Sequence, residues 1–297
     1  MNTFKNLLEE KKVIISDGAW GTELMKAGLK DECPELWNIT HPEEIKKVAL
    51  SYIQSGAEIL LTNTFGGNFL KLKKYRLNDK IIELNRRGVE LSKKVAGKTL
   101  VFASLGSTGE FLEPVGELTE KEMIENFIGQ VKGFIEGNAD GVVMETMSDI
   151  NEVRCALKAI RGLSEMPVIV SMTFSKGPKG FATITGITPE KFGEIMEKEN
   201  VDAIGANCTL SINDFIPLSE ILKKSTSFPV WIKPNAGMPQ IKNGEVFYLD
   251  TPEYMAGYAK DLIEKGAGII GGCCGTTPRH IKLMVEERNR LIQSEAF

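Results

Sequence analysis

Two cysteines stand side by side near the end of the chain, in the stretch GGCCGTTP at residues 271–278. A third, Cys208, lies in the earlier stretch GANCT. Thiolates are soft ligands that suit zinc, and three protein ligands leave one tetrahedral position open, as in catalytic zinc sites. If Cys208, Cys273 and Cys274 meet at one point, the sequence predicts a metal centre with a free position.

The glycines around Cys273 and Cys274 fit this prediction. Neighbours in a regular strand point to opposite faces, so two consecutive ligands need an irregular backbone, which glycine permits. Adjacent cysteines are also poor disulfide partners, because the S–S geometry strains the backbone. The chain has five cysteines, an odd number that does not indicate a disulfide framework. We interpret Cys155, in a helical pattern, as a core residue and Cys33, in a loop, as a bystander.

The free position of such a centre suits a thiol substrate better than water. Three thiolates give the complex a negative charge, which weakens its power to acidify a bound water. A free thiol has a pKa of about 8.5 and is mostly protonated at neutral pH. Zinc binding removes that proton and leaves a nucleophilic sulfur. The cysteine pattern therefore indicates an enzyme that alkylates a thiol.

The elements that would position these cysteines alternate regularly along the chain. Amphipathic stretches of helical periodicity begin with start signals such as Pro42 or Thr119 with Glu122, and they separate short apolar runs typical of buried parallel strands. Eight strand-then-helix units predict an α/β fold, a single (β/α)8 TIM barrel that forms one domain over residues 1–297. The alternative is a doubly wound open sheet, but no G-x-G-x-x-G follows the first strand. The predicted strands cover residues 13–17, 58–65, 100–106, 141–147, 168–174, 203–209, 230–237 and 268–275.

Polar residues end several of these predicted strands. Barrel enzymes carry their active sites at the carboxyl ends of the strands. We therefore expect Asp17, Glu145, Asn207 and Asn235 to face the same opening as the three cysteines. Two structural alternatives stay open: Asp17 caps the turn that follows it, and Glu145 pairs with Lys233.

The remaining polar features have a structural interpretation. His41 and His280 both fall at helix starts, and we expect neither to take part in chemistry. The stretches Lys176–Gly180 and Pro239–Glu245 are typical of surface loops. The chain has neither a Ser/His/Asp arrangement for hydrolysis nor a phosphate-binding loop.

Charge and hydropathy exclude several classes of protein. The net charge is −4 and the sequence contains no basic patch, so we expect no nucleic-acid partner. No apolar run reaches the roughly 18 residues of a membrane helix, so we expect no membrane association. The first residues, MNTFKNLLEEKK, are polar and charged rather than typical of a secretory signal. We therefore expect a cytoplasmic protein.

Six stretches together resemble the homocysteine S-methyltransferase family: DGAWGTEL, LTNTFG, ETMSDINE, GANC, PNAG and GGCCGTTPRHI. The resemblance covers about residues 10 to 290. Within the family, the motifs are most similar to those of the homocysteine-binding module of cobalamin-dependent methionine synthase. It implies one homocysteine-binding (β/α)8 barrel domain, residues 1–297, that transfers a methyl group to L-homocysteine, giving methionine. It also implies one zinc ion, bound by Cys208, Cys273 and Cys274, that binds the substrate sulfur.

The resemblance assigns roles to further residues. Glu145 would contact the amino group of homocysteine, while Asp17, Gly18 and Ala19 would hold the amino-acid end of the substrate. Asn235 would lie near the metal and occupy the open position before substrate arrives. Asn207 would support the neighbouring ligand, Cys208.

The resemblance does not fix the methyl donor. Methionine synthases carry folate, cobalamin and activation domains after this module, whereas this chain stops at Phe297, so it is an excised module or a stand-alone enzyme. We expect methylcobalamin on a corrinoid protein, with S-methylmethionine, S-adenosylmethionine or a betaine-like amine as alternatives. A different small thiol, or selenohomocysteine, is an alternative acceptor. A zinc- or thiol-binding module without enzyme activity is the alternative from another class.

Overall fold

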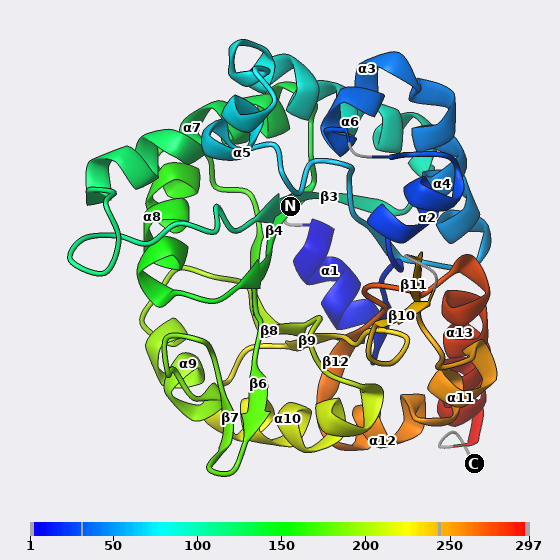
Figure 1. Ribbon diagram of the computed structural model, residues 1–297. Coiled ribbons are helices and arrows are strands. Elements are labelled where there is room, and N and C mark those ends of the chain that lie inside the picture. The colour runs from blue at the N-terminus through cyan, green and yellow to red at the C-terminus, as the bar shows by residue number, and fades with distance from the viewer. Residues whose placement is uncertain (1–2, 31, 243–244, 295–297) are drawn as a thin grey trace.

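The computed structural model describes residues 3–30, 32–242 and 245–294. Its centre is a ring of parallel strands in the order β1-β12-β9-β8-β5-β4-β3-β2 (Figure 1). A parallel bridge between Ser16 and Ile59 joins the two ends of this order and closes the ring. The predicted barrel is therefore confirmed, with all eight predicted strands in place. The strands are β1 Ile14–Ile15, β2 Ile59–Leu60, β3 Leu100–Gly106, β4 Gly141–Met147, β5 Val168–Met172, β8 Ala203–Asn207, β9 Val230–Lys233 and β12 Ala267–Ile270.

Helices surround this ring and bury one apolar face against it. Two predicted start signals are confirmed: Pro42 occupies the first turn of α4, and Thr119 and Glu122 form a reciprocal capping box at α7. Residues 252–264 form two short helices that meet at Tyr258. The longer helices are α4 Pro42–Gln54, α6 Ile81–Ala96, α7 Glu120–Glu136, α8 Ile150–Arg161, α9 Pro189–Met196, α10 Ile212–Ser225 and α13 Pro278–Ser294, and the shorter ones are α2 Gly21–Lys26, α3 Trp37–Thr40, α5 Phe69–Lys74, α11 Pro252–Gly257 and α12 Ala259–Glu264.

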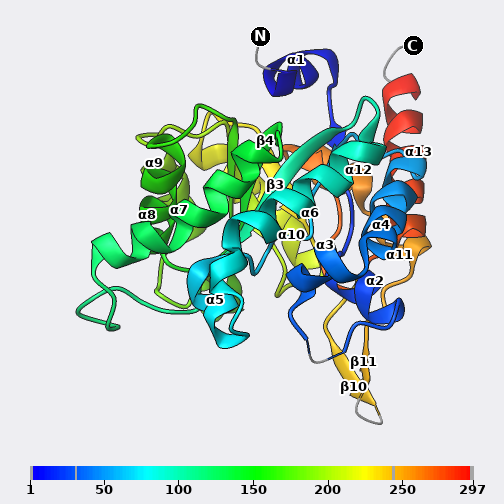
Figure 2. The ribbon, with the colours of Figure 1, turned by 90° about the horizontal axis from the view of Figure 1, so that it is seen from above.

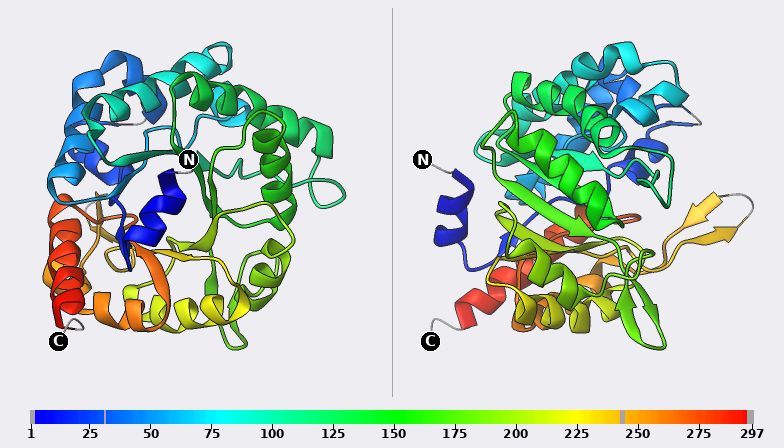
Figure 3. Two further views of the ribbon diagram at one scale, coloured as in Figure 1. Left: turned by 180° about the vertical axis from the view of Figure 1, so that it is seen from behind. Right: turned by 90° about the vertical axis from the view of Figure 1, so that its left-hand side faces the viewer.

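Helix α1, Thr3–Glu10, lies across the amino-terminal end of the barrel (Figure 3). Phe4 is 1% exposed and packs edge-on against Phe102, with ring centroids 5.1 Å apart. Phe4 shares a cluster with inward-facing strand residues such as Ile14 and Trp231. This apolar plug closes one end of the barrel, so polar chemistry is confined to the opposite end.

Two hairpins extend from the segments that follow β5 and β9, where surface loops were predicted. Strands β6, Ser175–Gly177, and β7, Gly180–Ala182, pair antiparallel, as do β10, Gln240–Lys242, and β11, Glu245–Phe247. The second hairpin projects from the end of the barrel opposite α1 (Figure 2). The loop prediction was wrong in secondary structure, because strands of three residues are too short to show an alternating pattern. Residues 243–244 of the predicted loop lie outside the described residues.

Among the described residues, no helix combines the length and the apolar character that a membrane span requires.

Candidate active site

The three predicted metal-binding cysteines come together at the carboxyl end of the barrel. The sulfur atoms of Cys208, Cys273 and Cys274 all lie within 4.8 Å of one another, and all three residues are half-buried. Cys208 directly follows β8, whereas Cys273 and Cys274 lie in the loop between β12 and α13. Strand β9 separates these two strands in the ring. Convergence across the barrel rim is thus a property of the fold, while metal binding stays a prediction.

The backbone at Cys208 adopts a conformation that side chains rarely favour. Cys208 and Thr209 have φ values of 64° and 53°, in the left-handed region. This conformation costs roughly 1–2 kcal/mol per residue for an L-amino acid. The Cys208 N–H donates to the Lys233 carbonyl at 3.2 Å, and the Thr209 hydroxyl donates to the Phe174 carbonyl at 2.7 Å. Strain of this kind persists where the surroundings fix it, which is typical of functional sites.

Close packing explains two glycines of the loop between β12 and α13, which contains Cys273 and Cys274. A Cβ atom on Gly271 would lie 2.1 Å from the Ser16 hydroxyl oxygen, and one on Gly272 would lie 2.3 Å from that of Thr276. Any side chain at either position would therefore move the cysteines that follow. The irregular backbone that the sequence predicted here is seen at Gly275, with a φ of 80°, whereas close contact accounts for glycine at positions 271 and 272.

The three thiols alter one another's protonation. The neighbouring Cys273 and Cys274 side chains lower the pKa of the Cys208 thiol to about 3. The same arrangement raises the pKa of Cys273 well above its usual range and that of Cys274 to about 11. Without a cation, the cluster therefore holds one thiolate and two thiols. A soft divalent ion such as zinc would stabilise all three as thiolates, so the donor set fits that metal.

Asn235 supplies a second observation that fits a cation. It follows β9, is 3% exposed, and its side chain helps to lower the pKa of the Cys208 thiol. Its amide oxygen is one of the buried side-chain atoms, among the residues the structure describes, that have no hydrogen-bond partner. An unpartnered buried oxygen costs about 1–3 kcal/mol. Beside three sulfurs, this oxygen is suited to contact a metal or a substrate atom.

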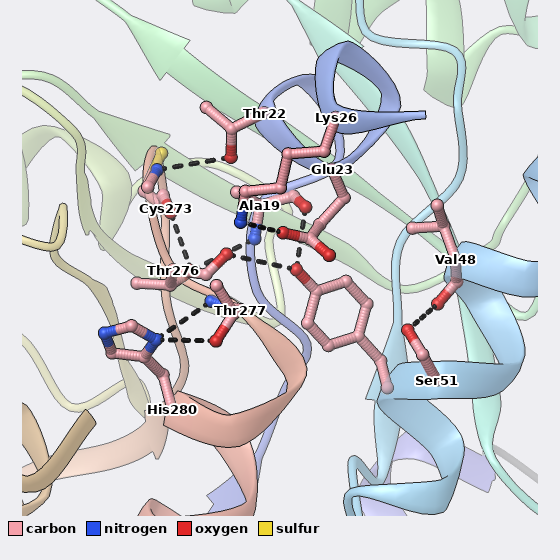
Figure 4. A network of polar contacts seen from close by, with 12 residues as sticks. Ala19, Thr22, Glu23, Lys26, Val48, Ser51, Cys273, Thr276, Thr277 and His280 are labelled. Atoms are coloured by element: carbon pink, nitrogen blue, oxygen red, sulfur yellow. Dashed lines mark hydrogen bonds and ion pairs between the residues drawn. The ribbon is translucent and has the colours of Figure 1, made fainter. Parts of the chain in front are cut away.

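The loop after β1 is fastened to the cysteine loop through Thr276 (Figure 4). The Thr276 hydroxyl donates to the Cys273 carbonyl at 2.7 Å and accepts from the Ala19 N–H at 3.1 Å. The Tyr52 hydroxyl donates to the Ala19 carbonyl at 2.7 Å. A Cβ atom on Gly18 would lie 2.8 Å from both Tyr52 and Thr276. Gly18 and Ala19 therefore have fixed positions beside the cysteines.

Asp17 and Lys233 form an ion pair inside the barrel. Their exposed side-chain fractions are 0% and 2%, and Nζ of Lys233 lies 2.6 Å from Oδ1 of Asp17. The other carboxylate oxygen accepts from the Leu61 N–H and from Nε1 of Trp20, each at 2.8 Å. Both oxygens of Asp17 are thus engaged. The sequence indicated Lys233 only as a partner for Glu145 and did not predict its pairing with Asp17.

Glu145 faces this interior by the regular alternation of β4, because Val143 lies in the inner cluster and the pairing with β3 is regular through Glu145. The strand becomes irregular just beyond it: the register with β5 shifts between Met144 and Met147, and Thr146 has a φ of 60°. Such irregularities are frequent next to active sites. Burial raises the pKa of Glu145, while the charge of Lys233 and a 2.5 Å hydrogen bond from Ser104 oppose that rise.

Hydrogen bonds of Asn207 connect the irregular backbone that follows Glu145 to the cysteine cluster. Its Oδ1 accepts from the Thr146 N–H at 2.9 Å and from the Ser171 hydroxyl at 2.6 Å. Its Nδ2 donates to the Thr146 hydroxyl at 2.8 Å and lies 3.7 Å from the Cys273 sulfur. Asn207 is completely buried, so a single rigid amide fixes both halves of the site.

The residues interpreted as structural lie in structural positions. Cys155 and Cys33 are each 2% exposed, and burial raises the pKa of both thiols. His280 links the Thr277 N–H, which donates to its Nδ1 at 3.0 Å, with the Asp250 carbonyl, 3.1 Å from its Nε2. His41 stacks on Trp37, with ring centroids 4.2 Å apart.

Tyr248, just after β11, is a neighbour of the cluster that the sequence did not indicate. Its ring packs against Gly275, where an added Cβ atom would lie 2.2 Å from Cγ of Tyr248. Burial, followed by the charge of the Cys274 thiol, raises the pKa of Tyr248.

Comparison with known proteins identifies the family. A family model described as homocysteine S-methyltransferase matches residues 14–288. The chain belongs to this family.

Individual relatives differ in overall length. Methionine synthase of Mycobacterium leprae is 30% identical over 92% of this chain, but the chain spans only 24% of that protein. Homocysteine S-methyltransferase YbgG of Bacillus subtilis is 29% identical over 95% of this chain and 96% of its own. The metallated form of the homocysteine methyltransferase MmuM from Escherichia coli superposes with a TM-score of 0.80 at 22% identity, covering 96% of this chain and 98% of that chain. The last likeness shows the shared barrel fold.

Proposed function

We propose that the protein binds one zinc ion through Cys208, Cys273 and Cys274 and transfers a methyl group to the thiol of L-homocysteine, giving methionine. The proposal rests chiefly on the three sulfur atoms within 4.8 Å of one another. The unpartnered amide oxygen of Asn235 beside them supports it. When bound, zinc would keep the substrate sulfur deprotonated at neutral pH.

The two buried carboxylates of the site, Asp17 and Glu145, have different roles. Both oxygens of Asp17 are engaged by Lys233 and its neighbours, so Asp17 neutralises Lys233 and shapes the floor of the site. Glu145 is then the carboxylate available to the substrate ammonium group, a charge-assisted contact. Gly18 and Ala19 form the turn that would lie against the amino-acid end of homocysteine.

Methyl transfer needs alignment more than acid–base catalysis. The sulfur electron pair forms the new S–C bond while the bond between the methyl carbon and its donor breaks, and the donor keeps that electron pair. The chain contributes orientation, because contacts at the amino-acid end fix the substrate sulfur relative to the rim. Asn207 holds both ends of this arrangement in register.

For the donor, we propose methylcobalamin on a corrinoid protein or domain. The likeness to methionine synthase, over 92% of the chain, supports this choice. A small donor such as S-methylmethionine or S-adenosylmethionine is the second candidate. Its support is the likeness to YbgG, a homocysteine S-methyltransferase that the chain matches over 96% of its length.

A donor comparison tests the proposed function directly. We expect the zinc-loaded chain to form methionine from L-homocysteine with methylcobalamin, and to do so faster than with S-methylmethionine or S-adenosylmethionine. Methionine is measured by mass spectrometry, with other small thiols as competing acceptors. Turnover with S-methylmethionine and none with methylcobalamin would refute the corrinoid donor. Homocysteine binding without turnover from any donor would instead support a binding module.

A further inference from the structure

Phe65 is an aromatic side chain at the carboxyl end of the barrel that has no role in the site described so far. It follows β2, and its carbonyl accepts from the Gly106 N–H at 2.9 Å. Its ring fills the space over Gly106, because a Cβ atom there would lie 2.5 Å from Cε2 of Phe65. Gly106 is the β3 partner of Glu145 in the sheet register. The ring, which is 36% exposed, therefore lies on the rim next to the carboxylate proposed to bind the substrate ammonium.

This exposed ring already carries a cation from the chain itself. Nζ of Lys71 lies 4.6 Å from the centroid of the Phe65 ring, within the range of a cation–π contact. Lys71 is half-buried and belongs to the first turn of α5. Its N–H donates to Oδ1 of the N-cap residue Asn68 at 3.0 Å, so the backbone from which the lysine side chain extends is fixed.

A buried carboxylate accompanies the ring and its cation. Glu35 is 3% exposed, and its Oε1 accepts from the N–H of Gly66, the residue after Phe65, at 2.6 Å. Burial lowers the pKa of Lys71, and the charge of Glu35 opposes this decrease. An aromatic face next to a carboxylate suits a positive charge, and Lys71 supplies that charge.

The small methyl donors considered above all carry a positive charge beside the methyl group. S-methylmethionine and S-adenosylmethionine are sulfonium ions, and a betaine-like amine is a quaternary ammonium ion. Aromatic faces bind such onium ions. A face that holds an ammonium is closed to them, and the like charges repel each other. Methylcobalamin presents its methyl group on cobalt and needs no such face.

We propose that Lys71 is a specificity-determining residue, which covers the Phe65 ring and disfavours small onium methyl donors at the rim. This inference rests on the methyl transfer to homocysteine proposed above and concerns only the choice of donor. Removal of the ammonium would uncover an aromatic face beside the Glu35 carboxylate. Affinity for an onium ion should then rise about 10-fold, as expected for a partly buried cation–π contact.

A binding test needs no turnover. Tetramethylammonium, an onium ion without an amino-acid end, is titrated into the zinc-loaded full chain and followed by ligand-observed NMR. Lys71→Met keeps the apolar length of the side chain and should bind this probe about 10-fold more tightly than the parent. Lys73→Met, at an exposed position of the same helix, makes the same charge change and should match the parent. Addition of Phe65→Leu to Lys71→Met should remove the gain, because it removes the ring.

A turnover test uses the same variants with L-homocysteine as acceptor. The ratio of kcat/KM for S-methylmethionine to kcat/KM for methylcobalamin should rise about 10-fold in Lys71→Met, and should keep the parent value in Lys73→Met. Equal tetramethylammonium affinity in Lys71→Met and the parent, or a gain that survives Phe65→Leu, would overturn the inference and leave the proposed function standing. A parent that forms no methionine from any donor would overturn the proposed function and this specificity role with it.

Discussion

Replacement of Cys273 by serine is expected to abolish zinc binding and methionine formation together. Serine keeps the size of the side chain, but it replaces a soft thiolate by a hydroxyl that stays protonated. Loss of a residue that only supports a ligand costs about 10- to 100-fold in metal affinity, so loss of a ligand should cost more than about 100-fold. The expected metal content therefore falls from near one zinc per chain to almost none.

Cys155→Ser is the matched control for this experiment. It removes a buried thiol from α8, far from the cluster in the fold, and should keep the metal content and the activity of the parent. Metal is measured by plasma mass spectrometry on reduced, freshly prepared protein, and activity by methionine formation. Full activity in a zinc-free Cys273→Ser protein would rule out the proposed role of zinc.

Glu145→Gln is expected to weaken homocysteine binding strongly while leaving the zinc content unchanged. Glutamine preserves the shape of the side chain and can still accept from Ser104, but it removes the charge that faces the substrate ammonium. A hydrogen bond to a charged group contributes about 1.5–3 kcal/mol, which corresponds to roughly 10- to 150-fold in the dissociation constant. The effect should appear in KM more than in kcat, because the contact is made equally in ground and transition states.

Glu110→Gln provides the comparison for Glu145→Gln. Glu110 is 48% exposed and pairs only loosely with Lys74, at 3.6 Å, so its loss should leave homocysteine binding unchanged. Dissociation constants are measured by isothermal titration calorimetry on zinc-loaded protein. Equal homocysteine affinity in Glu145→Gln and the parent would show that another group binds the ammonium.

The barrel was predictable because its strands and helices leave a clear pattern. Strands buried on both faces appear as short apolar runs, and helix caps such as Thr119 with Glu122 mark where helices begin. Once eight such units are recognised, the carboxyl ends of the strands must share one rim, which brings Cys208 near Cys273 and Cys274. Chain order and topology alone therefore predict the cluster.

Other parts of the site depend on contacts that no local pattern records. Asp17 and Lys233 pair although they lie 216 positions apart, and each strand end taken alone allows several partners. The irregular backbone that follows Glu145 depends on the register with β5, which the sequence does not specify. Tyr248 follows a three-residue strand, too short to be recognised, so its packing against Gly275 appears only in three dimensions.

The most direct test of the account is zinc X-ray absorption on the zinc-loaded chain, with and without L-homocysteine. The site proposed here predicts three sulfur neighbours at about 2.3 Å in the free protein and four when homocysteine is bound. The increase should be absent with L-methionine, which offers no free thiol. A sulfur count that stays at three with homocysteine bound at saturation would contradict the central claim that the metal binds the substrate sulfur.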